Sequence, residues 1–205
     1  TIPLEEYVKK GCAILDEEEC DTLRISMINY LWKSQVESGA KLEAVIPILS
    51  LCVDMDEVYT PIQNSEICGA IGIACMIAQK SKIPNRILLV QSRTSVSMPM
   101  PMLVNLSGCH NFIDMLRELR TQINMQLGPH EASKPDVVSA VKKINEIAVS
   151  TGIDARNILP VLISNNPPEM RGIKSVLQKD QHIVIWNTGT IKTPISVSYT
   201  HLRAH

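Results

Sequence analysis

Apolar side chains recur every three or four residues along most of this chain, which is the period of a helix with one buried face. This spacing predicts helices over four segments: residues 3–15, 21–37, 112–127 and 133–151. A fifth helix is predicted over residues 60–80, which begin Thr60-Pro61-Ile62-Gln63. Threonine caps a helix well, proline suits the first helical position, and the glutamine completes a capping box.

Two further segments, residues 41–53 and 154–163, are predicted to be helices and contain one internal proline each, Pro47 and Pro160. Residues 41–53 are apolar on almost every side, and a helix that is apolar all round belongs in the centre of a protein, so this one is predicted to be central. Residues 166–179 are predicted to form one more capped helix.

Extended structure is predicted in only a small part of the chain. Residues 86–92 and 182–186 are apolar runs of strand length, and residues 190–195 are placed to return as the second strand of a hairpin. Residues 97–106 contain two prolines, which lack the amide hydrogen that a central strand needs, so an extended arm or edge segment is predicted. The predicted fold is mainly α: a multi-helix globular domain with a minor component of short strands and extended segments.

A Gly-Pro step at Gly128 divides the chain into two predicted subdomains. Residues 1–128 form an N-terminal helical subdomain with one extended segment over residues 86–106. Residues 133–195 form a C-terminal helical subdomain that ends in a β-hairpin.

The final residues, 197–205, have the sequence VSYTHLRAH. This string matches one reading frame of a common transposase-tagging sequencing adapter, so we interpret it as translated adapter and exclude it from every motif. The alternative is a genuine polar segment. On the adapter interpretation the sequence is a truncated fragment, and the native chain continues beyond residue 195.

Composition indicates a globular protein with a substantial core, because 45% of the residues are hydrophobic and 20% are charged. Aromatic residues make up only 3%, so the core is predicted to be aliphatic. The net charge of −1 gives no support for a strongly cationic surface that coats nucleic acid. No apolar run approaches the ~18 residues that a membrane span needs, so no membrane association is expected.

Gly69 and Gly72 lie inside the predicted helix over residues 60–80, where each costs about 1 kcal/mol of helix stability relative to alanine. We predict that they let another backbone approach closely. The alternative, a phosphate-binding glycine loop, lacks the lysine and the strand–turn–helix context that such a loop requires.

The six cysteines include no C-x-x-C pair. We expect free thiols in the reducing cytoplasm, with a disulfide framework as the alternative. Histidines are scarce outside residues 197–205, so neither a zinc site nor another metal site is predicted, and no cofactor is expected. The acidic run 54–57 is interpreted as a solvated loop, although its oxygens are of the kind that bind Mg²⁺ or Ca²⁺.

Cys109 and His110 are the candidate catalytic residues, because a thiol near the start of a helix can have a lowered pKa and act as a nucleophile. Adjacent helical residues point about 100° apart, so the two side chains do not automatically meet. The alternative is an ordinary structural role for both.

Lys80, Lys82, Arg86 and Arg93 bracket the first predicted strand and are the candidate nucleic-acid-binding residues. Cations at such spacing contact phosphates along a nucleic-acid backbone. Aromatic partners for stacking bases are scarce nearby, and an ordinary solvated surface is the alternative. A second basic group on the last predicted helix has the same two interpretations.

No set of residues matches a catalytic or metal motif, so we expect a non-enzymatic assembly or scaffold protein of the cell interior. It is expected to act through association with itself or with another protein. A coat or nucleocapsid-like shell with backbone contacts to nucleic acid is one form of this function. The alternative is an enzyme domain whose cysteine-based site is completed by sequence beyond the present C-terminus.

Overall fold

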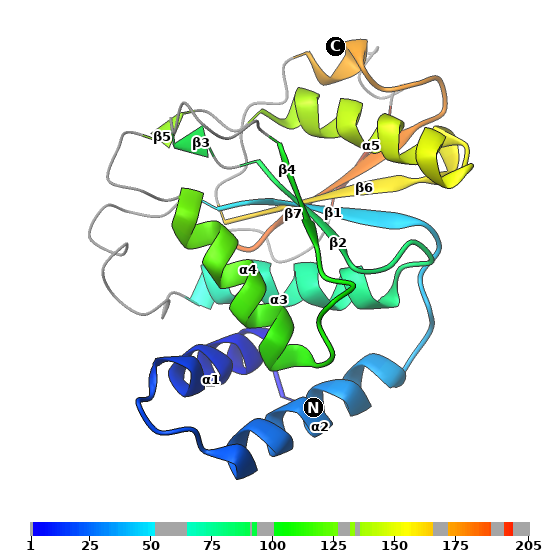
Figure 1. Ribbon diagram of the computed structural model, residues 1–205. Coiled ribbons are helices and arrows are strands. Elements are labelled where there is room, and N and C mark those ends of the chain that lie inside the picture. The colour runs from blue at the N-terminus through cyan, green and yellow to red at the C-terminus, as the bar shows by residue number, and fades with distance from the viewer. Residues whose placement is uncertain are drawn as a thin grey trace.

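The computed structural model describes residues 2–51, 65–90, 92–93, 101–126, 132–133, 136–165, 172–189 and 195–198 (Figure 1). Within these residues the α-helices are α1 (Leu4–Asp16), α2 (Thr22–Glu37), α3 (Ser65–Lys80), α4 (Phe112–Gln126) and α5 (Val137–Thr151). The strands are β1 (Val45–Ser50), β2 (Arg86–Leu89), β3 (Ser92–Arg93), β4 (Met102–Asn105), β5 (Ala132–Ser133), β6 (Leu159–Ser164), β7 (His182–Asn187) and β8 (Ile195–Ser198). Two 3-10 helices, η2 (Ala155–Asn157) and η3 (Ile173–Ser175), complete the elements.

Six of the strands form one mixed sheet in the order β4-β2-β1-β6-β7-β8. β2, β1, β6 and β7 are parallel to one another, whereas β4 and β8 run antiparallel to them at the two edges. β3 and β5 pair separately as a small ribbon. The fold of the described residues is therefore α/β around a central sheet, and the prediction of a mainly α fold with minor strands is wrong.

The error lies in the two proline-containing segments that are predicted to form helices. Residues 41–53 contain β1, and residues 154–163 contain η2 followed by β6. Strands that are covered on both faces have a continuous apolar sequence instead of an alternating one, and periodicity alone cannot separate such a run from a buried helix. The helix predicted over residues 166–179 is also wrong for its described part, where η3 is the helical element.

Pro160 lies in the central strand β6, and the ladder register explains how it fits there. Leu159 N donates to Ala44 O, so the amide of Leu159 faces β1. Because the amides of a strand alternate between its two neighbours, the nitrogen of Pro160 faces β7. Pairing between β6 and β7 begins only at Val161, so the missing amide hydrogen removes no ladder bond.

Pro47 fits into β1 for the same reason. Val90 N donates to Leu49 O, so alternate residues of β1, Pro47 among them, face β2. Pairing between β1 and β2 begins at Ile48, opposite Leu88. Each proline therefore lies one residue before its strand gains its second neighbour, which is where a central strand tolerates proline.

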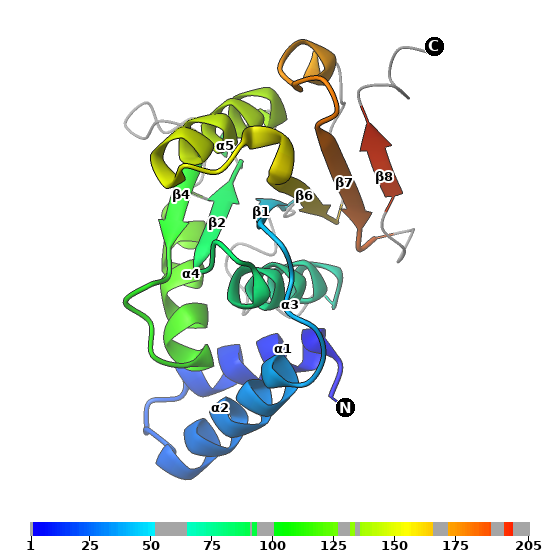
Figure 2. The same cartoon turned by 90° about the vertical axis from the view of Figure 1, so that its right-hand side faces the viewer.

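Helices cover both faces of the sheet (Figures 1 and 2). α3 lies against one face with α4 beside it, and α1 and α2 lie further from the sheet on the same side, whereas α5 covers the opposite face. Side chains of β1 alternate between the two resulting cores. Val45 and Leu49 belong to the larger core around α3, and Ile46 and Ile48 belong to the smaller core under α5.

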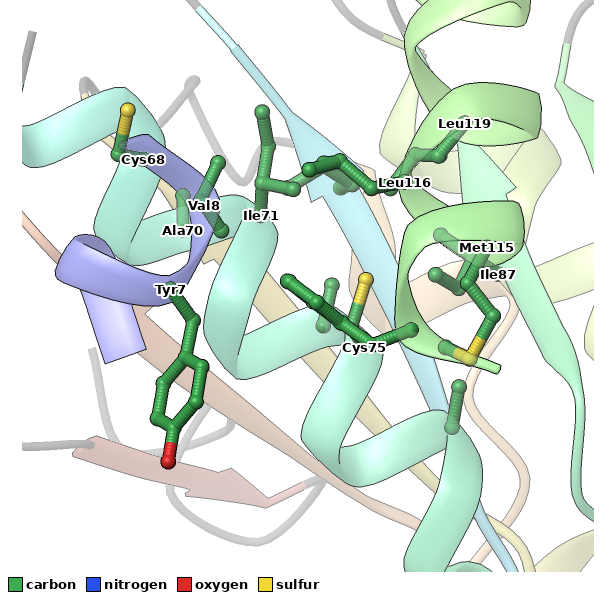
Figure 3. Packing of buried hydrophobic residues seen from close by; sticks show 14 of the residues in the cluster. Tyr7, Val8, Cys68, Ala70, Ile71, Cys75, Ile87, Met115, Leu116 and Leu119 are labelled. Carbon is green, nitrogen blue, oxygen red and sulfur yellow. The ribbon is translucent and has the colours of Figure 1, made fainter. Parts of the chain in front are cut away.

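α3 is the centre of the larger core (Figure 3). Its Cys75 is fully buried, and Leu116 of α4 contributes to the same cluster. A Cβ built on Gly72 would lie 2.9 Å from Leu4 O, so the predicted close approach of another backbone is confirmed there. It is wrong for Gly69, where no described atom lies within 4 Å of such a Cβ.

The other predicted elements agree with the structure in type. The helices predicted over residues 3–15, 21–37, 60–80, 112–127 and 133–151 correspond to α1, α2, α3, α4 and α5. β2 and β7 confirm the two predicted strands, and β4 confirms the predicted edge segment. β8 begins at Ile195, the last residue of the predicted returning strand, and residues 190–194 of that prediction lie outside the described residues. No described helix is both long and apolar enough to cross a membrane.

Two boundaries that the sequence predicts can be located in the sheet. β1 and β6 belong to different predicted subdomains, and they pair along six successive positions from Val45 to Ser50. Val197 and Ser198, the first residues of the segment interpreted as adapter, continue β8 and pair with Ile183 and His182. Residues 199–205 lie outside the described residues, so the adapter interpretation stays a prediction.

Candidate functional site

Three polar side chains stand in one row at the carboxyl ends of neighbouring parallel strands. Ser50, Ser164 and Asn187 end β1, β6 and β7, and the register places Ser164 opposite both of the others. Strand order runs outward from β1 to β2 on one side and to β6 on the other, which makes the β1–β6 boundary a topological switch point. Open α/β sheets bind ligands outside the carboxyl ends of their strands at such a point. We call this side of the sheet the carboxyl edge.

Hydrogen bonds tie the end of β7 to the first turn of α3 at the carboxyl edge. Thr188 N donates to Ser164 O at 2.9 Å, and Thr188 Oγ1 donates to Glu66 O at 2.9 Å. Gly189 follows, and a Cβ added to it would overlap Asn165 O, so no other residue fits without a shift of the backbone. The turn after β7 is therefore held against both β6 and α3.

A cavity of about 390 Å³ opens between this turn, α1 and α3. We call it the acidic cleft, and it is lined by Glu5, Ser65, Glu66, Gly69, Ile73, Trp186, Thr188 and Gly189. Its volume lies within the range of about 300–1,000 Å³ that is typical of ligand sites. Gly69 leaves room in it, because a Cβ there would have no described atom within 4 Å.

Two carboxylates line the acidic cleft, Glu5 from α1 and Glu66 from α3. Of the residues that the structure describes, Lys9 is a cation beside the cleft; its Nζ donates to Ser65 Oγ at 2.6 Å and lies 3.7 Å from Glu6 Oε1. Lys9 is thus held by a hydroxyl and by a glutamate of its own helix. Among the described residues, three glutamates against one lysine give this region a net negative charge.

Trp186 supplies the aromatic surface of the acidic cleft. It lies in β7 opposite Ile163, and its half-buried side chain packs against the larger core. The face of an indole ring attracts an ammonium group by about 0.5–2 kcal/mol, depending on how far the pair is removed from water. The cleft therefore combines an apolar surface, from Trp186 and Ile73, with an anionic one, from Glu5 and Glu66.

An alkylammonium group has a charge and a shape that suit this combination of surfaces. Its charge is attracted by carboxylates, and its hydrocarbon stem packs on apolar surface. A phosphate or carboxylate group would instead meet like charge. Among the residues that the structure describes, no group of three or more histidine, cysteine, aspartate or glutamate side chains is arranged to hold a metal ion.

Cys109 and His110 lie away from the acidic cleft. They follow β4, and because β4 is antiparallel, the chain leaves it at the amino ends of the parallel strands. Cys109 is half-buried against the larger core and His110 is exposed. Burial, followed by the carboxylates of Glu118 and Asp114, raises the pKa of the Cys109 thiol. This is the opposite of the lowered pKa that motivates a nucleophilic role.

Thiol labelling in a Cys52→Ser background tests this assignment, because none of the five described cysteines forms a disulfide. We expect exposed Cys20 to react first with iodoacetamide, and Cys109 to react at least about tenfold more slowly because its thiolate is scarcer and less accessible. Burial raises the pKa of Cys75 to about 12, so Cys75 should react only on unfolding. Mass spectrometry of the alkylated peptides gives the rates, and a Cys109 that outpaces Cys20 would restore the cysteine-enzyme hypothesis.

The candidate nucleic-acid-binding residues lie at the two ends of β2. Lys80 donates to a backbone carbonyl beyond α2 at 2.8 Å, and Lys82 lies 3.6 Å from Glu43. Arg86 begins β2, whereas Arg93 follows its other end, and the Arg93 side chain lies outside the described residues. Lys80 and Lys82 line a hollow of about 710 Å³ that also contains two glutamates, so its charge is mixed.

The sequence does not reveal the acidic cleft, because Glu5, Glu66 and Trp186 are far apart in the chain and fit no motif. A usable signal is the polar turn that follows Trp186, since residues after parallel strands gather at one edge of a sheet. That signal is useful only once β1 and β6 are recognised as strands. The acidic run 54–57 and Arg171 lie outside the described residues.

The chain matches no known family model, no curated protein and no solved structure. Its function is therefore inferred from the geometry and chemistry of the carboxyl edge.

Proposed function

We propose that this chain is a non-enzymatic binding module that holds an alkylammonium group, the side chain of a lysine on a partner protein, in the acidic cleft. The observation that carries this proposal is the convergence of Glu5, Glu66 and the Trp186 indole on one open cavity. Three elements of the fold supply these groups, so their relative positions are set by the packing of α1, α3 and β7.

The charge of the cleft favours a cationic ligand over an anionic one. Glu5 is half-buried and Glu66 is exposed, so each contributes only a modest attraction of about 0.2–1 kcal/mol, which salt weakens. Two carboxylates acting on one ammonium group still disfavour every anionic competitor. This supports a cationic partner over the phosphate backbone of a nucleic acid.

The apolar surface of the cleft favours a ligand whose ammonium group is attached to a hydrocarbon chain. Ile73 and Trp186 offer hydrocarbon and aromatic contact, and Gly69 leaves the volume that a side chain at that position would fill. A lysine side chain combines a cationic end with a four-carbon stem and so uses both kinds of surface. A small inorganic cation would use only the carboxylates.

The hydroxyl groups of the cleft favour recognition over catalysis. Ser65 Oγ accepts a hydrogen bond from Lys9, and Thr188 Oγ1 donates one to the carbonyl of Glu66. Neither hydroxyl is placed beside a histidine among the residues described here. Cys109, the candidate nucleophile of the enzyme alternative, lies at the other end of the sheet with a raised pKa.

Fluorescence titration with N-acetyl-lysine amide tests the proposal. The chain has two tryptophans, and Trp32 is only 1% exposed, so a ligand in the cleft changes mainly the emission of Trp186. We expect saturable binding in the millimolar range, about −4 kcal/mol, for this isolated residue. Glu5→Gln and Glu66→Gln should each weaken it by about threefold, and added salt should weaken it further.

Two further variants separate loss of the site from loss of the fold. Gly69→Leu places a side chain in the open volume and should abolish binding while the thermal midpoint is unchanged or raised. Glu146→Gln removes an exposed carboxylate on α5, on the opposite face of the sheet, and should leave binding unchanged. Equal binding by wild type and Gly69→Leu would overturn the proposal.

A further inference from the structure

The outer face of α2 carries a row of exposed apolar side chains. Leu23, Met27 and Tyr30 are 77%, 57% and 70% exposed, and their spacing places them on one side of the helix. α2 lies at the periphery of the molecule (Figure 2), and its other side buries Ile28 and Trp32 in the larger core. Grouped apolar side chains on a surface mark a contact site, whereas single ones do not.

We propose that this row is the interface between two copies of the chain, which pair through antiparallel α2 helices about a twofold axis near Met27. In such an isologous contact, residues equally far from Met27 on either side face each other. Arg24 then lies opposite Tyr30 of the other copy, which places a guanidinium group near an aromatic ring.

The two ends of α2 differ in charge, and this difference selects the antiparallel arrangement. Acidic residues gather where the chain enters the helix: Glu17, Glu18, Glu19 and Asp21. Cations outnumber anions where the chain leaves it, with Lys33, Lys41, Lys80 and Lys82 against Glu37 and Glu43. A parallel pairing would place acid against acid, whereas the antiparallel one joins each acidic end to an end with a net positive charge.

Ion pairs inside each copy reduce the difference in charge between the two ends of α2 without removing it. Arg24 pairs with Glu17, and Lys33 lies 3.8 Å from Glu37 with both side chains mostly exposed. Exposed pairs of this kind exchange partners at little cost. Glu18, Glu19 and Lys41 remain as the exposed charges of the two ends.

The hollow at the end of α2 extends the interface. It is lined by Val36, Gly39, Lys41 and Leu42, together with Lys80 and other residues. In the antiparallel arrangement, residues 17–19 of one copy face residues 35–37 of the other at the rim of this hollow. Glu17 then lies opposite Glu37, whose carboxylate lies 3.8 Å from Lys33 of its own helix. A 16-residue helix is about 24 Å long, so a pair of α2 helices alone buries a small area. The contacts at the two ends add to the buried surface, of which a specific complex needs ~1,200 Å².

This interface lies on α2, away from the acidic cleft, so it is independent of the proposed lysine binding. Sedimentation equilibrium over a concentration series tests it, and wild type should show a reversible monomer–dimer equilibrium. Met27→Lys places two lysines face to face at the axis and should raise the dissociation constant by about a hundredfold. Val149→Lys replaces an apolar side chain that is 85% exposed on α5 and should leave the dimer unchanged.

Charge complementation tests the orientation of the helices. The double variant Lys33→Glu with Lys41→Glu, and the double variant Glu18→Lys with Glu19→Lys, should each dimerise weakly alone because like charges then meet. An equimolar mixture of the two should form a heterodimer within about tenfold of the wild-type affinity, detected by native mass spectrometry. A monomeric wild type, a Met27→Lys protein that dimerises like wild type, or a mixture without heterodimer would overturn the inference.

Discussion

Replacing Trp32 with alanine is expected to lower the free energy of unfolding by about 4 kcal/mol, the largest effect of any substitution considered for this chain. The Trp32 ring is 1% exposed and stacks on Phe112 with a centroid distance of 4.2 Å. Tyr7 meets the same ring edge-on at 5.2 Å, so three helices contact one another through these aromatic rings. The indole nitrogen also donates to Gln79 of α3, and the substitution leaves that amide without its partner.

Chemical denaturation followed by far-ultraviolet circular dichroism measures this change. Tyr30→Ala is the matched control, because Tyr30 lies on the same helix and is 70% exposed. At concentrations where the chain is monomeric, that control should change stability by less than about 0.5 kcal/mol. A Trp32→Ala protein as stable as the control would mean that α2 does not pack on α1, α3 and α4 as described.

Two glycines of α3 are expected to respond to alanine in opposite directions. At Gly72 the new Cβ would lie 2.9 Å from both the Cβ and the carbonyl oxygen of Leu4, so α1 must shift, and we expect a loss of about 2 kcal/mol. At Gly69 the Cβ meets no described atom within 4 Å, so the gain in helix propensity should raise stability by about 1 kcal/mol.

Thermal and denaturant unfolding of the two variants side by side provides the measurement. The substitution is chemically identical and the two positions lie one helical turn apart, so each variant controls for the other. Two changes of the same sign would contradict the placement of α1 on α3 and of the open volume beside Gly69.

The sequence predicts the amphipathic helices of this fold well and its central strands poorly. α1, α2, α4 and α5 each have one buried face, so helical periodicity identifies them. β1 and β6 are covered on both faces, which removes the alternation that marks a strand. Pro47 and Pro160 add to the difficulty, because their fit depends on which neighbour their nitrogens face, and the sequence alone does not contain that information.

The candidate site could be predicted less well than the fold. Gly69 is recognisable as an unusual glycine inside a helix, but its role as open volume depends on what surrounds it. Glu5, Glu66 and Trp186 meet only because α1 packs on α3 and β7 ends beside the first turn of α3. For Cys109 the sequence suggests a functional residue that the structure does not support. Its position near a helix start suggests a lowered thiol pKa, whereas its burial raises that pKa.

The most direct test of the central claim, that the acidic cleft binds an alkylammonium group, is a pair of nuclear magnetic resonance titrations on uniformly ¹⁵N-labelled protein. One uses N-acetyl-lysine amide, and the other uses N-acetyl-norleucine amide, which has a hydrocarbon side chain without the charge. We expect the lysine compound to shift the Trp186 indole and the Gly69 and Gly189 amide signals, and the norleucine compound to leave them nearly unchanged. Equal shifts from both compounds, or lysine-induced shifts confined to residues outside the cleft, would contradict the claim.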